Sequence, residues 1–520
     1  LCAYDQKGYF SPLLIQHVAR RQPDPISRYA RHIQRRHRFD AADWCRAMTA
    51  ALMSRSIQDA TSTELETALE LAGPDNESPA TEVIEKLSAA ATAWSRGLTD
   101  LIMSRATAGS PGWLAINSCS FPRRTTLSLT AANGDQRSVT VDLPACGFAW
   151  ISDELPESPR KPASKKSPPD DDWLLANDRL EVTFNAATGG IARVRHPQKR
   201  EERLSQLVSF RFPRERKIPT GEEGAPPVKT FYAETRCLGH EAVPTEGPVQ
   251  EFVTWGEIVD QLQPQTLAKF RQTTRLFRSR PVIEIDVELS DVKVPDGDPW
   301  NNYFCLRFAW HDSTAAVTRS VLDGAQAFAG ERFESTGGIE IASESERTII
   351  VPHGLPFHRQ TGPRMLDTLL VVAGETERRF RCTVVLDQSY LLETTRDVLS
   401  PVFVQPTTSG PPRSGTQGWL FHLDARNVQL LRLLDVENPI TEDRDEPEPW
   451  RTLSGFAVRL LETEGRSRPV KLRTFRQPVF ARTRDLRGDT RRELSIDGDT
   501  VLIDIGPYEL ADVELRFAAT

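Results

Sequence analysis

In one stretch of the chain, residues 282–289, Val282 leads into a strict alternation of apolar and acidic side chains from Ile283 to Leu289. Successive side chains of a β-strand point to opposite faces, so this period of two predicts a strand with one face in a core and the other in water. Residues 180–184 alternate in the same way before a turn at 185–190 and a restart at Ile191. Many short stretches of this kind, without long amphipathic helices between them, predict antiparallel β-sandwiches rather than an α/β barrel.

The segment in front of these strands, residues 24–107, has the pattern of α-helices. Residues 41–53 and 63–71 are rich in strong helix formers, and Gly73-Pro74 ends the second run. A third run carries an apolar stripe at three- and four-residue spacing, formed by Ile84, Leu87, Ala91, Trp94, Leu98 and Leu101. Such a stripe is typical of a helix that packs on its neighbours, so we expect a small helical bundle.

The chain of 520 residues is too long for one hydrophobic core, and we expect several domains. Two stretches rich in proline and polar residues, 156–172 and 405–416, are predicted to be linkers. The other predicted segments are a helical bundle at 1–108, a small β subdomain at 109–155, a large β-sandwich at 173–404 and a C-terminal β subdomain at 417–520. The predicted fold class is therefore mainly β.

Charge and cysteine usage exclude several classes of partner. A net charge of -7 gives no field that would attract a phosphate backbone, so we expect no nucleic-acid partner. No apolar stretch approaches the roughly 18 residues of a membrane-spanning helix, and we expect no membrane partner. The seven cysteines are scattered without a C-x-x-C pair, which favours reduced thiols and a cytoplasmic location. Because the chain begins at Leu1 rather than Met, we expect its natural N-terminus to be missing.

The histidines are the first candidates for a site. His32 and His37 lie in an Arg-rich stretch, 28–38, which we interpret as a solvated or inter-domain face rather than a metal or nucleic-acid site. His311, His353 and His358 flank predicted strands, where they could line a sugar pocket or serve as surface or capping residues. No Walker-type, G-x-S-x-G or H-E-x-x-H motif occurs.

Carboxylates and aromatic residues form two further candidate sets. Glu284, Asp286 and Glu288 would lie about 7 Å apart on one sheet face. We favour a solvated face that blocks edge aggregation, although glycosidases do use two carboxylates about 5 to 9 Å apart. An aromatic set, which could stack on sugar rings but which core packing explains better, consists of Trp300, Tyr303, Phe304 and Trp310.

Several segments, taken in order, resemble glycoside hydrolase family 38, the α-mannosidases. Residues 175–184 with Thr188-Gly189-Gly190-Ile191 resemble the opening of the family's large, galactose-mutarotase-like β domain. Upstream, residues 113–117 and Phe121-Pro122-Arg123 resemble its first β strand and Asn-to-Arg turn, behind helices that resemble its central bundle. Downstream, the segments that resemble the family are 353–356, 367–372, 455–462 and 507–510.

The resemblance implies a retaining glycosidase in which an Asp attacks the anomeric carbon and a zinc ion held by His and Asp grips the sugar hydroxyls. In the family those groups belong to an α/β domain that precedes the bundle and begins with a His-x-Asp strand. The only His-x-Asp here, His422-Leu423-Asp424, falls in the C-terminal β set, and residues 37–40 match the late His-His-Asp element poorly. No catalytic, cofactor-binding or metal residue is therefore carried over to this chain, and zinc is expected only in the full-length enzyme.

Two hypotheses about function follow, and both take a mannose-containing glycan as partner. In the first, the chain is the C-terminal portion of an α-mannosidase-like glycosidase, and its sandwiches shape the sugar cleft. In the second, it is a carbohydrate-binding or structural β protein without hydrolytic activity. A third, a polysaccharide lyase or other sugar-active sandwich, would require a Tyr/His/Arg cluster on a concave sheet. Linkage preference and oligomeric state stay open.

Overall fold

The computed structural model describes residues 12–55, 59–73, 81–106, 109–131, 134–154, 173–198, 202–212, 232–243, 247–260, 265–321, 323–344, 346–434, 436 and 453–518. The chain forms two compact units, each assembled from two separate parts of the sequence. Unit 1 consists of Leu1–Ile33 and Ser164–Leu391, and unit 2 consists of Gln34–Ala163 and Leu392–Thr520. The predicted linker at 156–172 lies outside the described residues.

The predicted helical region is confirmed. It contains α1 (Leu13–Ala19), α2 (Ser27–Leu52), α3 (Ala60–Leu71) and α4 (Thr81–Met103). In unit 2, Phe39 of α2 packs with Leu65 and Leu69 of α3 and with Leu87 of α4, as expected of a bundle. Two short helices were not predicted, α1 and α5 (Leu391–Leu399), because seven and nine residues are too few to show a helical period. None of the described helices is both long and apolar enough to cross a membrane.

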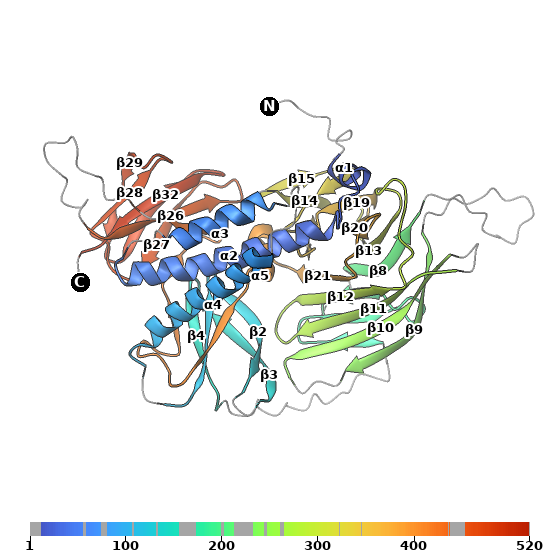
Figure 1. Ribbon diagram of the computed structural model, residues 1–520, viewed down its shortest axis with the longest axis horizontal. Helices are drawn as coiled ribbons and strands as arrows, with labels where there is room; N and C mark the ends of the chain where they lie inside the picture. The colour runs from blue at the N-terminus through green and yellow to red at the C-terminus, as the bar shows by residue number, and fades with distance from the viewer. Residues whose placement is uncertain are drawn as a thin grey trace, which may run out of the picture. The chain divides into compact units, whose positions relative to one another are not determined.

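Unit 1 is a two-layer β-sandwich, with β8 and β13 in one layer and β9 to β12 in the other (Figure 1). Nine of its described strands form one sheet, in the order β15-β14-β17-β18-β21-β12-β11-β10-β9. Eight form the other, in the order β16-β19-β20-β13-β8-β7-β6-β5. Every described pairing in these sheets is antiparallel, which confirms the predicted mainly β class.

The strands of unit 1 have the following bounds: β5 (Leu174–Ala176), β6 (Glu181–Phe184), β7 (Ile191–Arg195), β8 (Leu204–Arg211), β9 (Glu234–Val243), β10 (Val249–Asp260), β11 (Gln265–Phe277), β12 (Val282–Ser290), β13 (Tyr303–Trp310), β14 (Ala316–Val321), β15 (Gly324–Phe328), β16 (Arg332–Glu334), β17 (Ile339–Ala342), β18 (Arg347–Val351), β19 (Phe357–Gly362), β20 (Met365–Val371) and β21 (Arg379–Leu386).

The two layers of unit 1 are joined by a core of aromatic and aliphatic side chains. The rings of Phe184 and Phe252 stack with their centres 4.2 Å apart, which joins β6 of one sheet to β10 of the other. An amide pair crosses this core, where Gln206 of β8 and Gln272 of β11 exchange hydrogen bonds of 3.0 Å. Because each buried amide satisfies the other, the polar pair avoids the cost of an unpartnered group. The strand predicted at 282–289 is β12, and its apolar residues are buried.

The segment 175–194 opens the sandwich as predicted, and its conspicuous polar residues have structural roles. The Asn177 side chain accepts hydrogen bonds from the backbone N–H groups of Arg179 and Leu180, and it donates to the Phe277 carbonyl at 2.7 Å. Gly189 has a φ of +72°, a left-handed conformation that favours glycine. The pair Asn177-Asp178 and the turn at Gly189-Gly190 therefore stabilise the ends of neighbouring strands.

Unit 2 contains four groups of described strands. Their orders are β22-β1-β4-β23, β2-β3, β24-β27-β31-β30 and β25-β26-β32-β28-β29. The bounds are β1 (Gly112–Asn117), β2 (Arg123–Thr130), β3 (Gln136–Leu143), β4 (Gly147–Ser152), β22 (Phe403–Thr407), β23 (Gln417–Trp419), β24 (Phe421–Leu423), β25 (Val428–Leu434), β26 (Gly455–Glu462), β27 (Arg468–Thr474), β28 (Phe480–Arg484), β29 (Thr490–Glu493), β30 (Ile496–Asp497), β31 (Thr500–Ile505) and β32 (Leu510–Arg516).

The stretch 405–416, predicted as a linker, begins inside a strand. Gln405, Pro406 and Thr407 belong to β22, which pairs with β1 at the edge of its sheet. Proline lacks an N–H group, but an edge strand needs only one side of its backbone for pairing, so Pro406 is tolerated there. The composition of the stretch suggested a solvated segment because it does not reveal the partner strand almost 300 positions earlier.

The turn after β1 is held by the two residues that the family resemblance singled out. Asn117 donates from Nδ2 to the Phe121 and Pro144 carbonyls at 2.9 and 2.8 Å. Arg123 is buried and donates to the Asp397 carboxylate at 2.8 Å and to the Ser400 carbonyl at 3.0 Å, at the end of α5. A cation at a helix C-terminus interacts favourably with the helix dipole. These residues therefore join the β1–β2 turn to α5.

The two C-terminal segments of the resemblance meet through one carboxylate. Glu462, at the end of β26, is 1% exposed and accepts hydrogen bonds from the N–H groups of Tyr508, Glu464 and Gly465 at 2.8 to 2.9 Å. A further donor to Glu462 is the Asn427 amide, at 2.8 Å. Burial tends to raise the pKa of Glu462, but these hydrogen bonds outweigh burial and the pKa is lowered.

We expect Glu462→Gln to destabilise unit 2 by about 2 kcal/mol at neutral pH, because hydrogen bonds to a charged acceptor are the stronger kind. A carboxyl group with a lowered folded-state pKa contributes stability above its unfolded pKa and loses it as the pH falls. The difference between wild type and variant should therefore shrink as the pH is lowered through the range of acid carboxyl titration. Urea unfolding at several pH values measures this, with Glu493→Gln on the exposed β29 as the control. A difference that does not change with pH would contradict the role of the charge.

Candidate functional site

The histidines that flank predicted strands are structural. His353 Nε2 lies 2.8 Å from the Thr383 hydroxyl, and burial lowers its pKa to about 3. His358 is fully buried, with Nε2 2.8 Å from the Ser335 carbonyl and Nδ1 3.1 Å from the Thr368 hydroxyl, and burial lowers its pKa to about 4. Both are neutral at pH 7 and have hydrogen-bond partners inside unit 1, which gives them structural roles. His311 is exposed.

The aromatic set and the acidic triplet also have structural roles. Trp300, Tyr303 and Phe304 are 0% exposed, which leaves no ring face for a sugar. The triplet pairs with arginines on the outer face of the nine-stranded sheet: Arg275 contacts Glu284 and Asp286, Arg381 contacts Asp286 at 2.6 Å, and Arg379 contacts Glu288 at 3.3 Å. The core interpretation of the aromatic set is confirmed, and the triplet lies on an outer face as predicted. The predicted role in blocking edge aggregation is wrong, because β12 lies between β21 and β11 inside the sheet.

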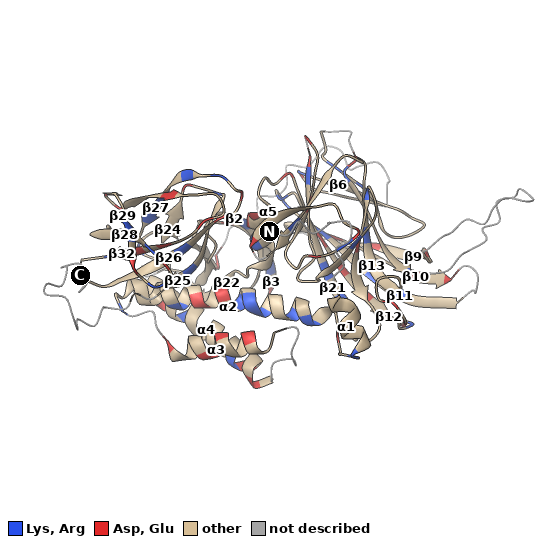
Figure 2. Ribbon diagram, turned by 90° about the horizontal axis from the view of Figure 1, so that it is seen from above, with Lys and Arg blue, Asp and Glu red and all other residues tan. Residues whose placement is uncertain are grey.

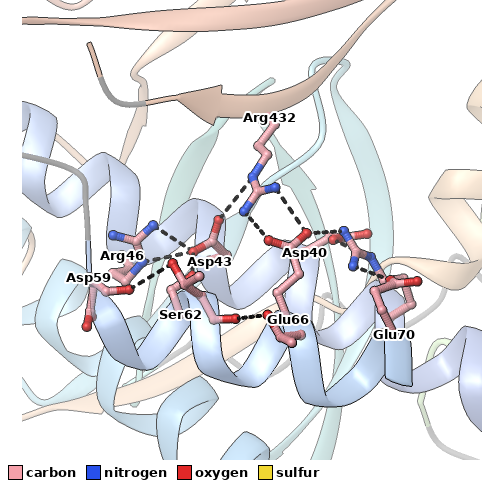
Figure 3. Close-up of polar contacts among 11 residues, drawn as sticks. Asp40, Asp43, Arg46, Asp59, Ser62, Glu66, Glu70 and Arg432 are labelled. Atoms are coloured by element: carbon pink, nitrogen blue, oxygen red, sulfur yellow. Dashed lines mark hydrogen bonds and ion pairs between the residues drawn. The ribbon is translucent and has the colours of Figure 1, made fainter. Parts of the chain in front are cut away.

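The acidic residues near His37 belong to an ion-pair network in unit 2 (Figure 3). Asp40 pairs with Arg36 at 3.0 Å, and Asp43 accepts from the Ser62 hydroxyl at 2.6 Å. Arg432 of β25 donates to Glu66 of α3 at 2.6 and 3.0 Å. Acidic and basic segments both occur along α2 (Figure 2). Arginines of the Arg-rich stretch form ion pairs with carboxylates of the same chain, Arg31 with Asp24 and Arg36 with Glu66 and Glu70. This network joins α2 and α3 to β25.

The described residues do not fit the zinc ion that the family resemblance implies. Among them, no group of three or more His, Cys, Asp or Glu side chains could hold a metal ion. Asp424 of the His-x-Asp triplet instead accepts the Lys471 N–H at 2.8 Å, as part of the pairing near β24 and β27. We therefore derive no catalytic step through zinc for these residues.

The structure brings together one polar cluster that the sequence analysis missed. Its centre is Asp367 on β20 of the eight-stranded sheet, which is 0% exposed. Tyr232 and Tyr303 donate their hydroxyl hydrogens to the same carboxylate oxygen, Oδ2, at 2.8 and 2.9 Å. Arg211 Nη1 in turn donates to the Tyr232 hydroxyl at 3.0 Å, and Arg307 Nε lies 3.8 Å from Oδ1. We call these five residues the Asp367 cluster.

Strand register places the cluster on the outer face of the eight-stranded sheet. Arg307 of β13 and Arg359 of β19 both lie directly opposite Asp367, so the three side chains share one face. The alternate residues of β13, including Leu306 and Phe308, are buried in the sandwich core. One signal was visible in the sequence: Asp367 is a lone carboxylate in the otherwise uncharged run 365–372, where a buried charge requires partners.

The electrostatics of the cluster make its phenols hydrogen-bond donors. Burial raises the pKa of Tyr232 to about 12, and the Asp367 charge adds to this effect. Burial also raises the pKa of Tyr303 and that of Asp367, although Arg307 and the two phenol hydrogen bonds act against the latter shift. A phenol with a raised pKa stays protonated at neutral pH, so it cannot serve as a general base there. At neutral pH the cluster therefore holds two phenol hydroxyls as donors to the Asp367 carboxylate.

Two members of the Asp367 cluster reach solvent. The Arg307 side chain is 21% exposed, and its guanidinium lies 3.8 Å from the centre of the Tyr232 ring. Stacking on the ring and attraction to Asp367 restrict the guanidinium to one orientation. The outer face thus presents a fixed guanidinium beside a half-buried phenol, a combination that suits the hydroxyl groups of a sugar.

A pocket of about 650 Å³ lies in the same unit, beside the ends of β15 and β19. Its volume falls within the usual range for ligand sites, about 300 to 1,000 Å³. Phe328 supplies an apolar wall, and Ser313, Glu331 and Gln360 supply polar groups. Glu331 also contacts Arg359, the residue opposite Asp367 in the sheet register. No member of the Asp367 cluster lines the pocket, so we take the pocket and the cluster as two separate candidate sites of unit 1.

The chain matches no protein-family model and no curated protein. Among solved structures, an α-mannosidase from Enterococcus faecalis V583 is 8% identical, with a TM-score of 0.65 over 96% of this chain and 68% of that one. A protein in glycosyl hydrolase family 38 from Enterococcus faecalis is also 8% identical, with a TM-score of 0.67 over 96% of this chain and 71% of that one. A galactose mutarotase related enzyme from Lactobacillus acidophilus covers 42% of the chain with a TM-score of 0.25.

We expect Tyr303→Phe to destabilise the eight-stranded sheet by about 1 to 3 kcal/mol, because it removes one of two donors to a buried carboxylate. Hydrogen exchange followed by mass spectrometry should show faster exchange in peptides that cover β13 and β20. The control is Tyr508→Phe, whose side chain is 60% exposed and whose hydroxyl loss should leave exchange unchanged. Equal exchange in β13 and β20 of wild type and Tyr303→Phe would contradict this role.

The first two solved structures together establish one point about this chain, its fold. Both align along almost the whole chain, while identities of 8% leave activity and substrate open. The fold implied by the sequence resemblance is thereby confirmed. The chain has a fold like that of glycoside hydrolase family 38 proteins.

Proposed function

We propose that this chain is the bundle-and-sandwich part of a glycoside hydrolase that acts on α-mannosides. The observation that supports this most is the fold likeness over 96% of the chain to an α-mannosidase and to a second family 38 protein. The ordered sequence segments point to the same family, and residues of three of them, Asn117, Asn177 and Glu462, have structural roles at turns or strand ends. The proposal extends the fold likeness to a substrate class, mannose-containing glycans.

In this proposal the chain's own residues bind and orient the sugar. Arg307 donates hydrogen bonds to sugar hydroxyls, and Asp367 together with the Tyr232 ring holds its guanidinium in place. The pocket beside β19 provides room for a sugar unit next to Phe328 and Gln360. Hydrogen bonds from a preorganised donor give orientation and specificity, because the protein side chain loses little freedom when the sugar binds. Zinc, if the full-length enzyme uses it as the family resemblance implies, is held by residues other than those described here.

A second candidate is a carbohydrate-binding protein without hydrolytic activity. One observation favours it: among the described residues no metal-competent group exists, and the acidic triplet is paired with arginines. The two candidates agree on the ligand and differ on the role of the chain in a larger enzyme. Finding the preceding His-x-Asp strand in the same gene would separate them in favour of the first.

The 520-residue chain should bind methyl α-mannoside and yeast α-mannan but should not hydrolyse an aryl α-mannoside, with or without added zinc. Isothermal titration measures the binding, and release of the aryl alcohol measures turnover. Zinc-dependent turnover by this chain alone would show that it holds the whole catalytic site. Absence of binding to both α-mannosides would overturn the proposed substrate class.

Within this experiment, Arg307→Met should weaken binding of methyl α-mannoside about tenfold, because the charged donor is lost while an unbranched apolar stem is kept. The matched control is Arg193→Met on β7 of the same sheet, whose side chain is 43% exposed and which lies outside the Asp367 cluster. Equal weakening in both variants would point to a general charge effect rather than to this site. Unchanged binding in Arg307→Met would remove the Asp367 cluster from the proposal.

A further inference from the structure

The outer face of the nine-stranded sheet carries an exposed indole. Trp255 of β10 is 37% exposed, while Phe252 and Thr254 on the same strand point into the sandwich, toward Phe184 and the Gly189 carbonyl. Side chains alternate along a strand, so Trp255 lies on the outer face. The Asp367 cluster lies on the other sheet, and this tryptophan is therefore a separate feature of unit 1.

The neighbouring strand holds the indole against the sheet. Gly239 of β9 lies opposite Trp255, and a side-chain carbon at that glycine would fall 2.4 Å from Cζ2 and 2.6 Å from Cε2 of the indole. Only glycine therefore allows the ring to lie directly on the backbone of β9. The pairing also shifts register at this point, as in a β-bulge, a feature that often marks functional positions on sheet edges. Contact with a glycine is a known way to protect an edge strand, but it leaves the remaining ring surface in solvent.

An arginine stands on the other side of the indole. Arg271 of β11 lies directly opposite Trp255 and is exposed. Among the described residues, no side chain or backbone group makes a hydrogen bond or ion pair with its guanidinium. This differs from Arg275 on the same strand, which contacts three carboxylates. Trp255 and Arg271 therefore form a directly opposed cross-strand pair, in which an apolar ring lies beside a guanidinium whose donors make no hydrogen bond to the described residues.

The surrounding charges select among possible ligands. The same face carries Glu241, Glu257, Lys269 and Glu288 in positions next to Trp255 and Arg271 by register. Three carboxylates beside the ring disfavour a nucleic acid, whose phosphates they would repel. Leu238, at the register shift beside Trp255, is the other exposed apolar side chain in this part of β9 and β10. The cores of protein interfaces are depleted in charged residues, so two apolar side chains among these charges make a poor protein-binding core. A sugar ring meets both requirements, because it has apolar C–H faces and a rim of hydroxyl groups.

We propose that Trp255 and Arg271 form a surface that binds a neutral polysaccharide, with one pyranose ring packed on the indole and its hydroxyls hydrogen-bonded to Arg271. This surface is distinct from the candidate site on the eight-stranded sheet, and it does not depend on α-mannoside being the substrate. Its role is to hold a long glycan on the protein while another part of the same glycan is bound elsewhere. Such a second contact raises the effective concentration of the glycan.

The test is binding of the full chain to three immobilised neutral polysaccharides: yeast α-mannan, amylose and a β-1,3-glucan. Wild type should bind at least one of them, and Trp255→Ala should weaken that binding about tenfold. Trp255→Phe, which keeps a ring over Gly239, should weaken the binding less than Trp255→Ala does. Arg271→Met should also weaken the binding, and this change leaves the packing of Trp255 on Gly239 untouched because Arg271 lies on the other neighbouring strand. Thermal unfolding of each variant shows whether the fold is retained.

Trp419→Ala is the matched control, since Trp419 is also 37% exposed but has the Arg473 guanidinium 4.9 Å from its ring centre. It should bind as wild type does. Binding to none of the three polysaccharides, or equal binding by wild type, Trp255→Ala and Arg271→Met, would overturn the inference. If Trp255→Ala loses polysaccharide binding but binds methyl α-mannoside as wild type does, this surface is separate from the Asp367 cluster. If Trp255→Ala keeps polysaccharide binding while Arg307→Met binds methyl α-mannoside more weakly, this inference fails and the proposed function is retained.

Discussion

The packing of two antiparallel sheets across one core is the constraint on which the rest of unit 1 depends. Phe184 and Phe252 stack across it, and the Gln206–Gln272 pair is satisfied within it. Once the inner faces are committed to this core, every alternate side chain of the same strands must lie on an outer face. The surface around Asp367 is the outer face of the eight-stranded sheet, and the surface around Trp255 is the outer face of the nine-stranded sheet.

The charged side chains on the outer faces of the two sheets differ in their exposure to solvent. On the nine-stranded sheet, arginines and carboxylates pair across neighbouring strands in partial contact with solvent, where each pair contributes little to stability. On the eight-stranded sheet, Asp367 is removed from water and must be compensated, which two phenols and Arg307 do. A buried carboxylate with this many partners orders its surroundings, and that order makes Arg307 and Tyr232 suitable for recognising a ligand.

The segments that resemble family 38 carry structural rather than chemical information. Asn117, Asn177 and Glu462 each satisfy backbone groups at turns or strand ends. Unpaired backbone groups in such places are costly, so these positions limit which residues are acceptable. This explains how a chain can share the fold of an α-mannosidase at 8% identity while its described residues contain no group suited to zinc.

The sequence by itself determined the elements whose pattern is local. The period of two at 282–289, the helical stripe at 84–101 and the turn at 185–190 depend on neighbours in the chain, and β12, α4 and the Gly189 turn confirm them. Tertiary structure alone decided which strands are neighbours. Tyr232 and Asp367 are 135 positions apart, and Trp255 meets Gly239 and Arg271 only through register. The same holds for Pro406, whose strand pairing depends on a partner near residue 113. Periodicity shows which face a side chain takes, but only the packing of distant strands shows what lies beside it.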